Sequence, residues 1–272
     1  MQLGASNWGF LYRRTLHEAI EELAACGYRV IELCATPPHV FTPSFGHLEA
    51  RELKALFARH DLTCATVNPT EMNLVSPNPE IRRLCYGQYV DALRFAREVG
   101  ARYLVVIPGR MNPVMPVPYD AAREMLLEAL AGLVGEAAQF EVEVTLETSP
   151  FGFLGTGAEI ASVVDEIDDP LLGMTFDVAN VFAQQDPAAG IREAADRIRV
   201  VHLADTRKNR FGHGAIGTGE VDFAAVRAAL EDVGFRGPVI YELVDGEDPT
   251  DRFRSGHGTL EDLGFSAGAV RR

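Results

Sequence analysis

The chain alternates a short apolar run with a longer amphipathic stretch eight times, and this pattern limits the folds open to it. The apolar runs are rich in Val, Ile and Leu, which is typical of strands buried on both faces of a parallel sheet. Successive runs start about 27 to 40 residues apart, enough for one strand and one returning helix. They begin near Gln2, Arg29, Leu62, Arg102, Val142, Leu171, Ile198 and Pro238.

Between these runs, apolar residues recur with the helical period and predict seven helices. Thr15 is a candidate N-cap with Glu18 three residues later, and Gly27 follows the end of the first helix. The expected helices cover residues 15–25, 48–59, 79–99, 119–139, 156–167, 186–195 and 222–233.

Eight strands and seven clear helices predict an α/β fold, the (β/α)8 TIM barrel, as a single domain over residues 1–272. The barrel is expected over residues 3–244, followed by an irregular tail over 245–272. The eighth helix is expected to be short, displaced or missing. An open doubly wound sheet is the alternative, but no G-x-G-x-x-G motif follows the first strand, which weakens its dinucleotide-binding version.

Charge, hydropathy and cysteine content limit the kinds of partner and the cellular compartment expected for the chain. There are 25 Lys and Arg against 39 Asp and Glu, a net charge of -14, which argues against a nucleic-acid partner. No apolar run approaches the roughly 20 residues that span a bilayer, and no signal peptide precedes the first strand, so no membrane partner is expected. Scattered cysteines without a C-x-x-C pair are typical of reduced thiols in a cytoplasmic protein. They are Cys26, Cys34, Cys64 and Cys85.

Four consecutive strand-like runs each end in an ionisable residue: Glu147, Asp177, His202 and Glu242. In a parallel barrel the C-terminal ends of the strands meet at one mouth, so these side chains are expected to converge. Three carboxylates and an imidazole are costly to bury together without a cation. Oxygen ligands with one imidazole suit Mn²⁺, Mg²⁺, Co²⁺ or Zn²⁺, so the sequence predicts one divalent-metal site.

Several motifs surround these strand ends. They are Phe176-Asp177, His202-Leu-Ala-Asp205, Ile216-Gly-Thr-Gly-Glu-Val-Asp-Phe223 and Tyr241-Glu242, with further matching pieces at residues 27–33, 73–77 and 100–109. In these features the sequence resembles the xylose-isomerase-like sugar (phosphate) isomerase/epimerase superfamily over nearly the whole chain. That group includes ketose 3-epimerases, inosose isomerases and dehydratases, and the related endonuclease IV enzymes.

The resemblance implies that Glu147, Asp177, His202 and Glu242 bind one divalent metal, with Mn²⁺ as the first choice. It also implies that Glu147 and Glu242 form the catalytic acid/base pair. Epimerisation beside a carbonyl removes a proton from one face of a carbon and returns it to the other, so two groups must flank the substrate. The metal would stabilise the enediolate.

Five further residues are predicted to contact the substrate. Trp8 is a candidate platform under a sugar ring, and Asn68 ends the third strand. Asn180 stands where many members of the group have a histidine, and it can hydrogen-bond a hydroxyl but cannot carry a proton. Arg210 follows an asparagine in a pattern that often contacts substrate in the group, and His213 either binds substrate or caps its loop.

Endonuclease IV enzymes carry additional histidine ligands, and here Asn68, Ile107 and Asn180 stand in those places, which argues against DNA repair. We therefore expect a metal-dependent isomerase or epimerase acting on a ketose, keto-inositol or related polyol. An inosose or keto-sugar dehydratase or lyase is one alternative. A non-catalytic barrel subunit of a larger complex is another, and the sequence leaves a homo-oligomer open.

Overall fold

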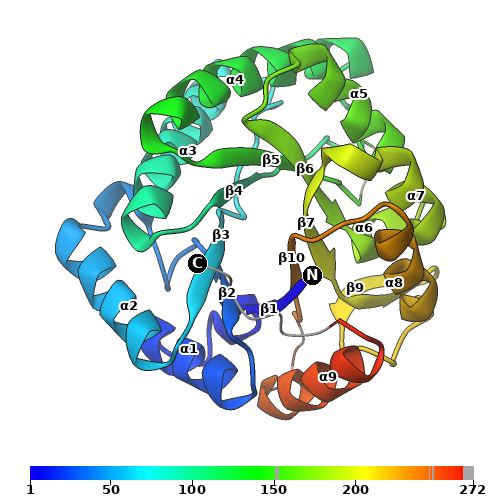
Figure 1. The fold of residues 1–272 in the computed structure, drawn as a ribbon. Coiled ribbons are helices and arrows are strands. Elements are labelled where there is room, and N and C mark those ends of the chain that lie inside the picture. Colours follow the sequence, from blue (N-terminus) through cyan, green and yellow to red (C-terminus); the bar gives the residue numbers. More distant parts are fainter. Residues whose placement is uncertain (151–152, 245, 247, 266–272) are drawn as a thin grey trace.

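A closed ring of parallel strands forms the centre of the molecule in a computed structural model that describes residues 1–150, 153–244, 246 and 248–265 (Figure 1). The order around the ring is β1-β10-β7-β6-β5-β4-β3-β2, and β1 pairs with β10 to close it. This confirms the predicted (β/α)8 barrel. The strands are β1 (Gln2–Ser6), β2 (Val30–Cys34), β3 (Thr63–Asn68), β4 (Tyr103–Val106), β5 (Glu143–Glu147), β6 (Leu172–Asp177), β7 (Ile198–Leu203) and β10 (Pro238–Tyr241).

Helices surround the strand ring, and seven of them lie where the helical period predicts (Figure 1). Thr15 caps the first helix through a reciprocal pair of hydrogen bonds with Glu18, as its sequence suggests. These helices are α1 (Leu16–Ala25), α2 (His47–Arg59), α3 (Pro79–Val99), α4 (Tyr119–Phe140), α5 (Gly157–Ile167), α7 (Pro187–Ala194) and α8 (Phe223–Asp232).

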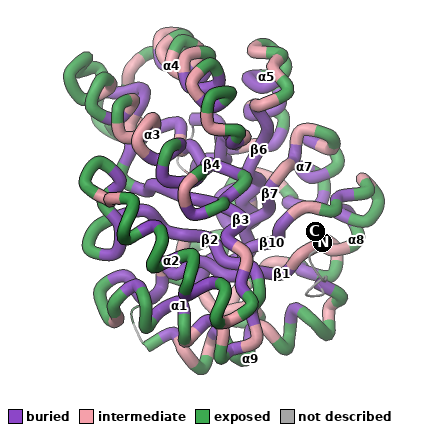
Figure 2. The backbone as a smooth tube through the Cα atoms, turned by 60° about the vertical axis from the view of Figure 1, so that its left-hand side comes forward, coloured by how far each residue is buried: buried purple, intermediate pink, exposed green. Residues whose placement is uncertain are grey.

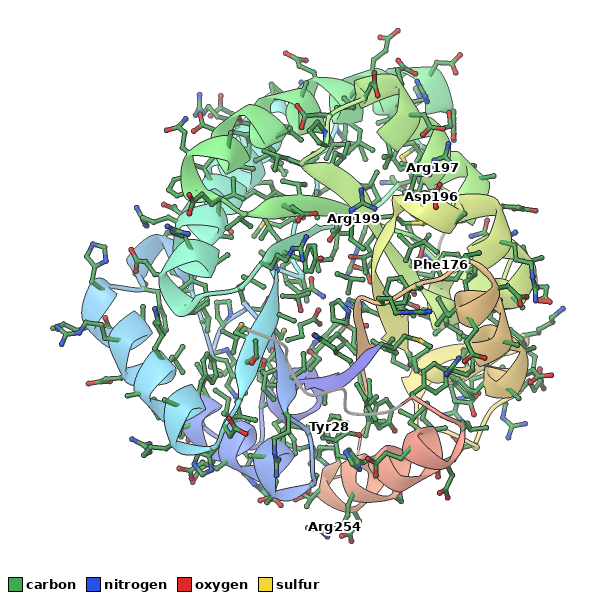
Figure 3. The ribbon with its side chains drawn as sticks, viewed as in Figure 1. Tyr28, Phe176, Asp196, Arg197, Arg199 and Arg254 are labelled. Carbon is green, nitrogen blue, oxygen red and sulfur yellow. The ribbon has the colours of Figure 1, made fainter. Side chains whose placement is uncertain are left out.

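The last helix, α9 (Thr250–Asp262), is longer than the sequence suggests, since only a weak helical stretch near residue 260 stood out there. Its glycines mask the pattern, but Gly256 has a packing role. A Cβ atom at this position would lie 2.5 Å from Cε1 of Tyr241, so glycine lets the helix approach the barrel closely. The hydroxyl of Tyr28, a residue labelled in Figure 3, donates a hydrogen bond to the carbonyl of Phe253 on α9. Of the predicted tail, residues 245, 247 and 266–272 lie outside the described residues.

Several short elements were not predicted. A two-stranded antiparallel hairpin follows β7, and a short helix follows β6 directly. They are β8 (Asp205–Arg207), β9 (Arg210–Gly214), α6 (Val178–Phe182) and the 3₁₀ turns η1 (Asn7–Phe10), η2 (Thr42–Ser44) and η3 (Ala195–Arg197). None of the helices in the described part of the chain has both the length and the apolar character needed to span a bilayer.

The strands of the ring are mostly buried (Figure 2). The buried apolar residues form two clusters, a large one between strands and helices and a small one inside the strand ring. Phe176, labelled in Figure 3, belongs to the outer cluster between β6 and the helices. The small inner cluster includes Val30, Val200 and Ile240. Alternate residues of a strand face the same side, so the residues two positions after these three also point into the ring. They are Glu32, His202 and Glu242. The apolar cluster thus forms a floor beneath polar side chains nearer the C-terminal mouth.

Candidate metal centre and active site

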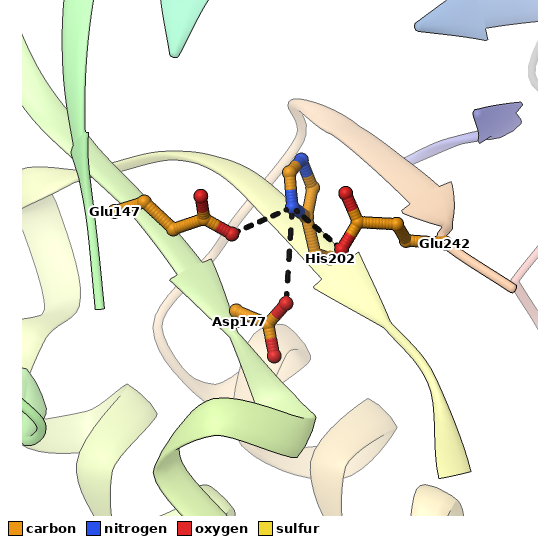
Figure 4. Close-up of side chains that lie close together, drawn as sticks. All are labelled: Glu147, Asp177, His202 and Glu242. Carbon is orange, nitrogen blue, oxygen red and sulfur yellow. Dashed lines mark hydrogen bonds and ion pairs between the residues drawn. The ribbon is translucent and has the colours of Figure 1, made fainter. Parts of the chain in front are cut away.

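The structure brings the four predicted ligand residues together at the C-terminal ends of four neighbouring strands (Figure 4). Glu147 ends β5, Asp177 ends β6, His202 lies one residue before the end of β7, and Glu242 directly follows β10. One potential ligand atom from each residue lies within 4.8 Å of those of the others. All four side chains are buried, so their charges are poorly screened by water.

The imidazole of His202 lies at the centre of the cluster. Its Nδ1 atom is 3.1 Å from Oε1 of Glu147, 3.7 Å from Oε2 of Glu242 and 3.9 Å from Oδ2 of Asp177 (Figure 4). Three carboxylates thus face one ring nitrogen, and this nitrogen is the atom that could join them as a metal ligand.

A fifth buried residue, Glu32 on β2, holds the other edge of the same ring. Its Oε2 atom lies 2.9 Å from Nε2 of His202 and also accepts a hydrogen bond from the Thr66 hydroxyl. Its Oε1 atom accepts a hydrogen bond from Nδ2 of Asn68. Glu32 is a polar residue in the second strand-like run, and it is not among the predicted ligands or substrate contacts. The missed signal is a carboxylate in the middle of an otherwise apolar buried run.

Burial and mutual repulsion set the protonation of the cluster in the absence of a cation. Burial raises the pKa of Glu242 well above its usual range, and the nearby carboxylates of Glu147 and Glu32 add to this effect. Burial also raises the pKa of Glu147. Burial disfavours the charged form of His202, but the carboxylates of Glu32 and Glu242 outweigh it and hold its pKa well above the usual value. In the absence of a cation, the raised pKa values of Glu242, Glu147 and His202 thus favour the protonated forms of these three side chains.

These residues fit a divalent cation. Buried carboxylates this close together are unfavourable unless a positive charge compensates them, and a divalent cation would supply that charge. Three hard oxygen ligands and one imidazole suit Mn²⁺, Mg²⁺, Co²⁺ or Zn²⁺, and the cluster has no thiolate that would favour a softer metal. The carboxylate of Glu32 beyond the histidine matches the usual environment of metal-binding imidazoles, which donate their second N–H to an oxygen.

The hairpin after β7 brings a second imidazole to the cluster. His213 on β9 places Nε2 3.1 Å from Oδ2 of Asp177 and 3.4 Å from Oε2 of Glu242. Burial opposes ionisation of Asp177, but His213 and His202 outweigh it and lower the pKa of Asp177. The sequence left open whether His213 binds substrate or caps its loop, and the structure places its ring directly against two of the predicted ligands.

A cavity of about 160 Å³ opens beside the cluster. Four of the five residues predicted to contact substrate are in its wall, together with the two glutamates of the predicted acid/base pair. Much of the remaining cavity wall is formed by Phe211, Ile107, Arg110 and residues 148–150. The predicted residues in the wall are Trp8, Asn68, Asn180 and His213.

Arg210, the fifth predicted residue, is exposed and lines a neighbouring depression of about 430 Å³ with Arg207. The two hollows share Phe211 and His213. The structure therefore does not bring Arg210 into the wall of the cavity beside the cluster. Its position on the hairpin could not be read from the sequence, because the strands β8 and β9 were not predicted.

Asp205, a conspicuous carboxylate just after β7, has a structural role. Its oxygens accept hydrogen bonds from the backbone N–H groups of Thr206, Gly217, Gly219 and Val221. A Cβ atom at Gly219 would lie 2.1 Å from Oδ1 of Asp205, so this turn needs glycine. The carboxylate thus fixes the loop that follows the hairpin.

The fold and the cluster together define a (β/α)8 barrel with a candidate divalent-metal site at the C-terminal ends of its strands. The sequence profile of the xylose isomerase-like TIM barrel family matches residues 20–263, and the chain belongs to this family.

Several known proteins share about a quarter of their residues with this chain. The chain is 24% identical over 236 residues to a D-psicose 3-epimerase of Ruminiclostridium cellulolyticum, covering 82% of this chain and 76% of the relative. It is 27% identical over 236 residues to an L-ribulose 3-epimerase of a Methylomonas species, covering 85% and 79%. The crystal structure of a D-tagatose 3-epimerase-like protein superposes with a TM-score of 0.84 at 21% identity, covering 97% of both chains. This structural similarity supports the fold.

Proposed function

We propose that the protein is a divalent-metal-dependent epimerase or isomerase of a ketose or a related keto-polyol. The observation that carries the proposal is the buried cluster in which two glutamates, an aspartate and a histidine converge beside a small cavity. Relatives that carry the names of ketose 3-epimerases, at 24% to 27% identity over most of the chain, support the same class of reaction.

Glu147, Asp177, His202 and Glu242 would hold one cation, with Mn²⁺ as the first choice. When bound, the cation supplies Lewis-acid chemistry, polarising a substrate carbonyl and stabilising negative charge on its oxygen. His202 would ligate through Nδ1, because its Nε2–H is directed at Glu32. Asp177 also accepts a hydrogen bond from the backbone N–H of Asn180, so its carboxylate is held in place by the start of α6.

Glu147 and Glu242 are the proposed acid/base pair. They come from β5 and from the end of β10, with β6 and β7 between them in the ring, so they reach the cavity from different sides. One carboxylate oxygen takes the proton from the carbon beside the carbonyl. The other carboxyl group returns a proton to the opposite face of that carbon, which inverts its configuration.

The cavity suits a compact polar substrate. Trp8 offers an aromatic face in the wall, and its ring centroid is 6.0 Å from that of His213. His213 and the side-chain amides of Asn68 and Asn180 supply polar groups. Aromatic faces combined with a few directed polar groups are well suited to sugars, which have both apolar C–H faces and hydroxyl edges.

Conversion of a small ketose panel tests the proposal. Purified protein loaded with Mn²⁺ would be incubated with D-psicose, D-tagatose and L-ribulose, and the products identified by NMR. We expect an epimer or isomer of at least one ketose, and loss of conversion after chelation. A dehydrated product would instead indicate a dehydratase. No conversion with any of the four candidate metals, in protein that retains no metal, would favour the non-catalytic alternative and contradict the proposal.

A further inference from the structure

Two side-chain amides in the cavity wall share one unusual property. Asn68 and Asn180 are both buried and line the cavity beside the cluster. The Oδ1 atom of each has no hydrogen-bond partner within the described part of the chain. A buried amide oxygen without a partner is destabilising, so such atoms usually mark the place of a ligand or water.

The orientation of each amide follows from the chemistry of its neighbours. Nδ2 of Asn68 lies 3.3 Å from Oε1 of Glu32 and 3.4 Å from Oε1 of Glu242. Rotating this amide by 180° would place its oxygen against the Glu32 carboxylate, which can only accept hydrogen bonds when ionised. The other oxygen of this carboxylate, Oε2, accepts a hydrogen bond from the Thr66 hydroxyl and lies 2.9 Å from Nε2 of His202, so Glu32 acts as an acceptor toward its other neighbours as well.

The amide of Asn180 is fixed in the same way by a different partner. Its Nδ2 atom donates a hydrogen bond of 2.9 Å to the backbone carbonyl of Thr148, which has no proton to give in return. Its backbone N–H is taken by the carboxylate of Asp177. In both residues the amide nitrogen therefore already donates to the protein, whereas the amide oxygen has no partner among the described residues.

We propose that Asn68 and Asn180 form an acceptor pair that selects substrates carrying two hydroxyl donors at separate positions. The two residues are not neighbours at the mouth: Asn68 ends β3 and Asn180 follows β6, with β4 and β5 between these strands. A hydroxyl has a single proton to donate, so two acceptors require two different hydroxyls of the sugar. This inference rests on the proposed function and narrows its substrate class to polyhydroxylated ketones with free hydroxyls at both positions.

Deoxy and deoxyfluoro analogues distinguish an acceptor wall from a donor wall. Replacing a hydroxyl by hydrogen leaves the amide oxygen without a donor, which costs about ten- to hundredfold in binding or in kcat/KM. Replacing it by fluorine restores the size and polarity of the group but cannot donate, so the deoxyfluoro sugar is as poor as the deoxy sugar. If the wall donated hydrogen bonds, fluorine would recover part of the loss.

The experiment uses metal-loaded wild-type protein and the three ketoses of the panel, each with its monodeoxy and monodeoxyfluoro analogues. Binding is measured by titration NMR and conversion by product analysis. The acceptor pair is supported if removing the hydroxyl at two different positions lowers affinity or kcat/KM about ten- to hundredfold and fluorine does not recover the loss. A loss of affinity alone is sufficient, whether or not conversion is seen. Conversion of a ketose with all analogues within threefold of the parent would overturn the pair but leave the proposed function intact. Absence of both binding and conversion for all ketoses overturns both.

Two variants assign the hydroxyls to their residues. In Asn180→Ala, the deoxy analogue at one position should bind and react no more than about threefold worse than the parent ketose, because the amide oxygen that accepts this hydroxyl is already gone. The other position should keep its full effect. Asn68→Ala should show the opposite pattern, whereas Asn112→Ala, in an exposed loop, should behave as wild type. Unchanged discrimination at both positions in a folded Asn180→Ala protein would contradict the assignment of Asn180.

Discussion

Nε2 of His202 lies 2.9 Å from Oε2 of Glu32, at the edge of the imidazole opposite the nitrogen that faces the three other carboxylates. This contact connects β2 to β7 across the inside of the barrel. It assigns the proton of a neutral His202 to Nε2 and leaves the Nδ1 lone pair free for a metal. Through Asn68, the same Glu32 side chain also contacts Glu242. One buried carboxylate therefore orients both the imidazole ligand and one member of the proposed acid/base pair.

We predict that Glu32→Gln weakens metal binding about 10- to 100-fold without unfolding the barrel. The amide can still accept a hydrogen bond from His202, but it has no charge to favour the Nε2–H tautomer and can rotate its own N–H₂ toward the ring. Isothermal titration with Mn²⁺ measures the affinity, and ¹⁵N NMR of His202 in the metal-free protein measures the tautomer.

The matched control for that variant is Glu124→Gln, which changes an exposed glutamate on α4 and should leave both readings as in wild type. Wild-type Mn²⁺ affinity and an unchanged tautomer in Glu32→Gln would show that Glu32 does not position the ligand.

Asp177 has two roles that two substitutions can separate. It is a proposed metal ligand, and its Oδ1 also caps α6 by accepting the N–H of Asn180. Asp177→Asn keeps an oxygen for the cap but loses the charge, so it should lose most bound metal with little change in metal-free stability. Asp177→Ala should lose the metal and also about 1 kcal/mol of stability from the cap. Metal analysis and urea unfolding of the metal-free proteins measure the two effects, and full metal content in both variants would exclude Asp177 as a ligand.

Stability should depend on pH in opposite ways with and without metal. In the metal-free fold the pKa of His202 is raised, so its stabilising contribution is complete below about pH 6.5 and is lost as the pH rises through the folded pKa. The raised pKa of Glu242 acts in the same direction. We therefore expect the Tm of metal-free protein to fall as the pH rises above neutrality, while the gain in Tm from Mn²⁺ increases because the metal displaces these protons.

Thermal melts across this pH range, with and without Mn²⁺, measure both trends. The His202→Gln variant should show a flatter metal-free profile, and the His17→Gln variant, at an exposed position on α1, should retain the wild-type profile. A metal-free Tm that rises with pH above neutrality would disprove the assigned direction.

Replacing Glu147 or Glu242 by glutamine should impair epimerisation in two different ways. Glu147→Gln and Glu242→Gln each keep an oxygen ligand but remove a titratable group, so each should lose about 10²- to 10⁴-fold in epimerisation. If each glutamate serves one face of the carbon, one variant still exchanges the substrate proton with solvent from one epimer. The other variant does so from the opposite epimer. Near-wild-type turnover in either variant would show that the proton travels by another route, and the ring of His213 lies nearby to provide one.

Much of the barrel could be predicted because its signal is local. Apolar runs such as Tyr103–Val106 alternate with amphipathic helices, and the capping box at Thr15 marks a helix start in a few residues. The helix α9 was not predicted because its stability comes from tertiary contact. Gly256 weakens the helical signal in the sequence, yet in the fold it allows close packing on Tyr241.

In the candidate site, too, residues with a local sequence signal could be predicted, and those placed by tertiary contacts could not. Glu147, Asp177 and Glu242 could be singled out because each ends or directly follows a buried strand, and parallel strands of a barrel end at one mouth. The contact of Glu32 with His202 depends on how strands three places apart face each other across the ring, which the sequence pattern does not contain. The positions of Arg210 and His213 depend on the hairpin, whose short strands lack a periodic signal.

Proton transfer at the metal centre is tested most directly by solvent-proton exchange at the carbon beside the substrate carbonyl. Wild-type protein would be incubated in D₂O with the ketose panel, with Mn²⁺ and then after chelation, and deuterium would be located by NMR. We expect deuterium at this carbon in both epimers of at least one ketose, dependent on metal and abolished in Asp177→Asn. Epimer formation without deuterium, or exchange that persists in chelated protein and in Asp177→Asn, would contradict proton transfer at this metal centre.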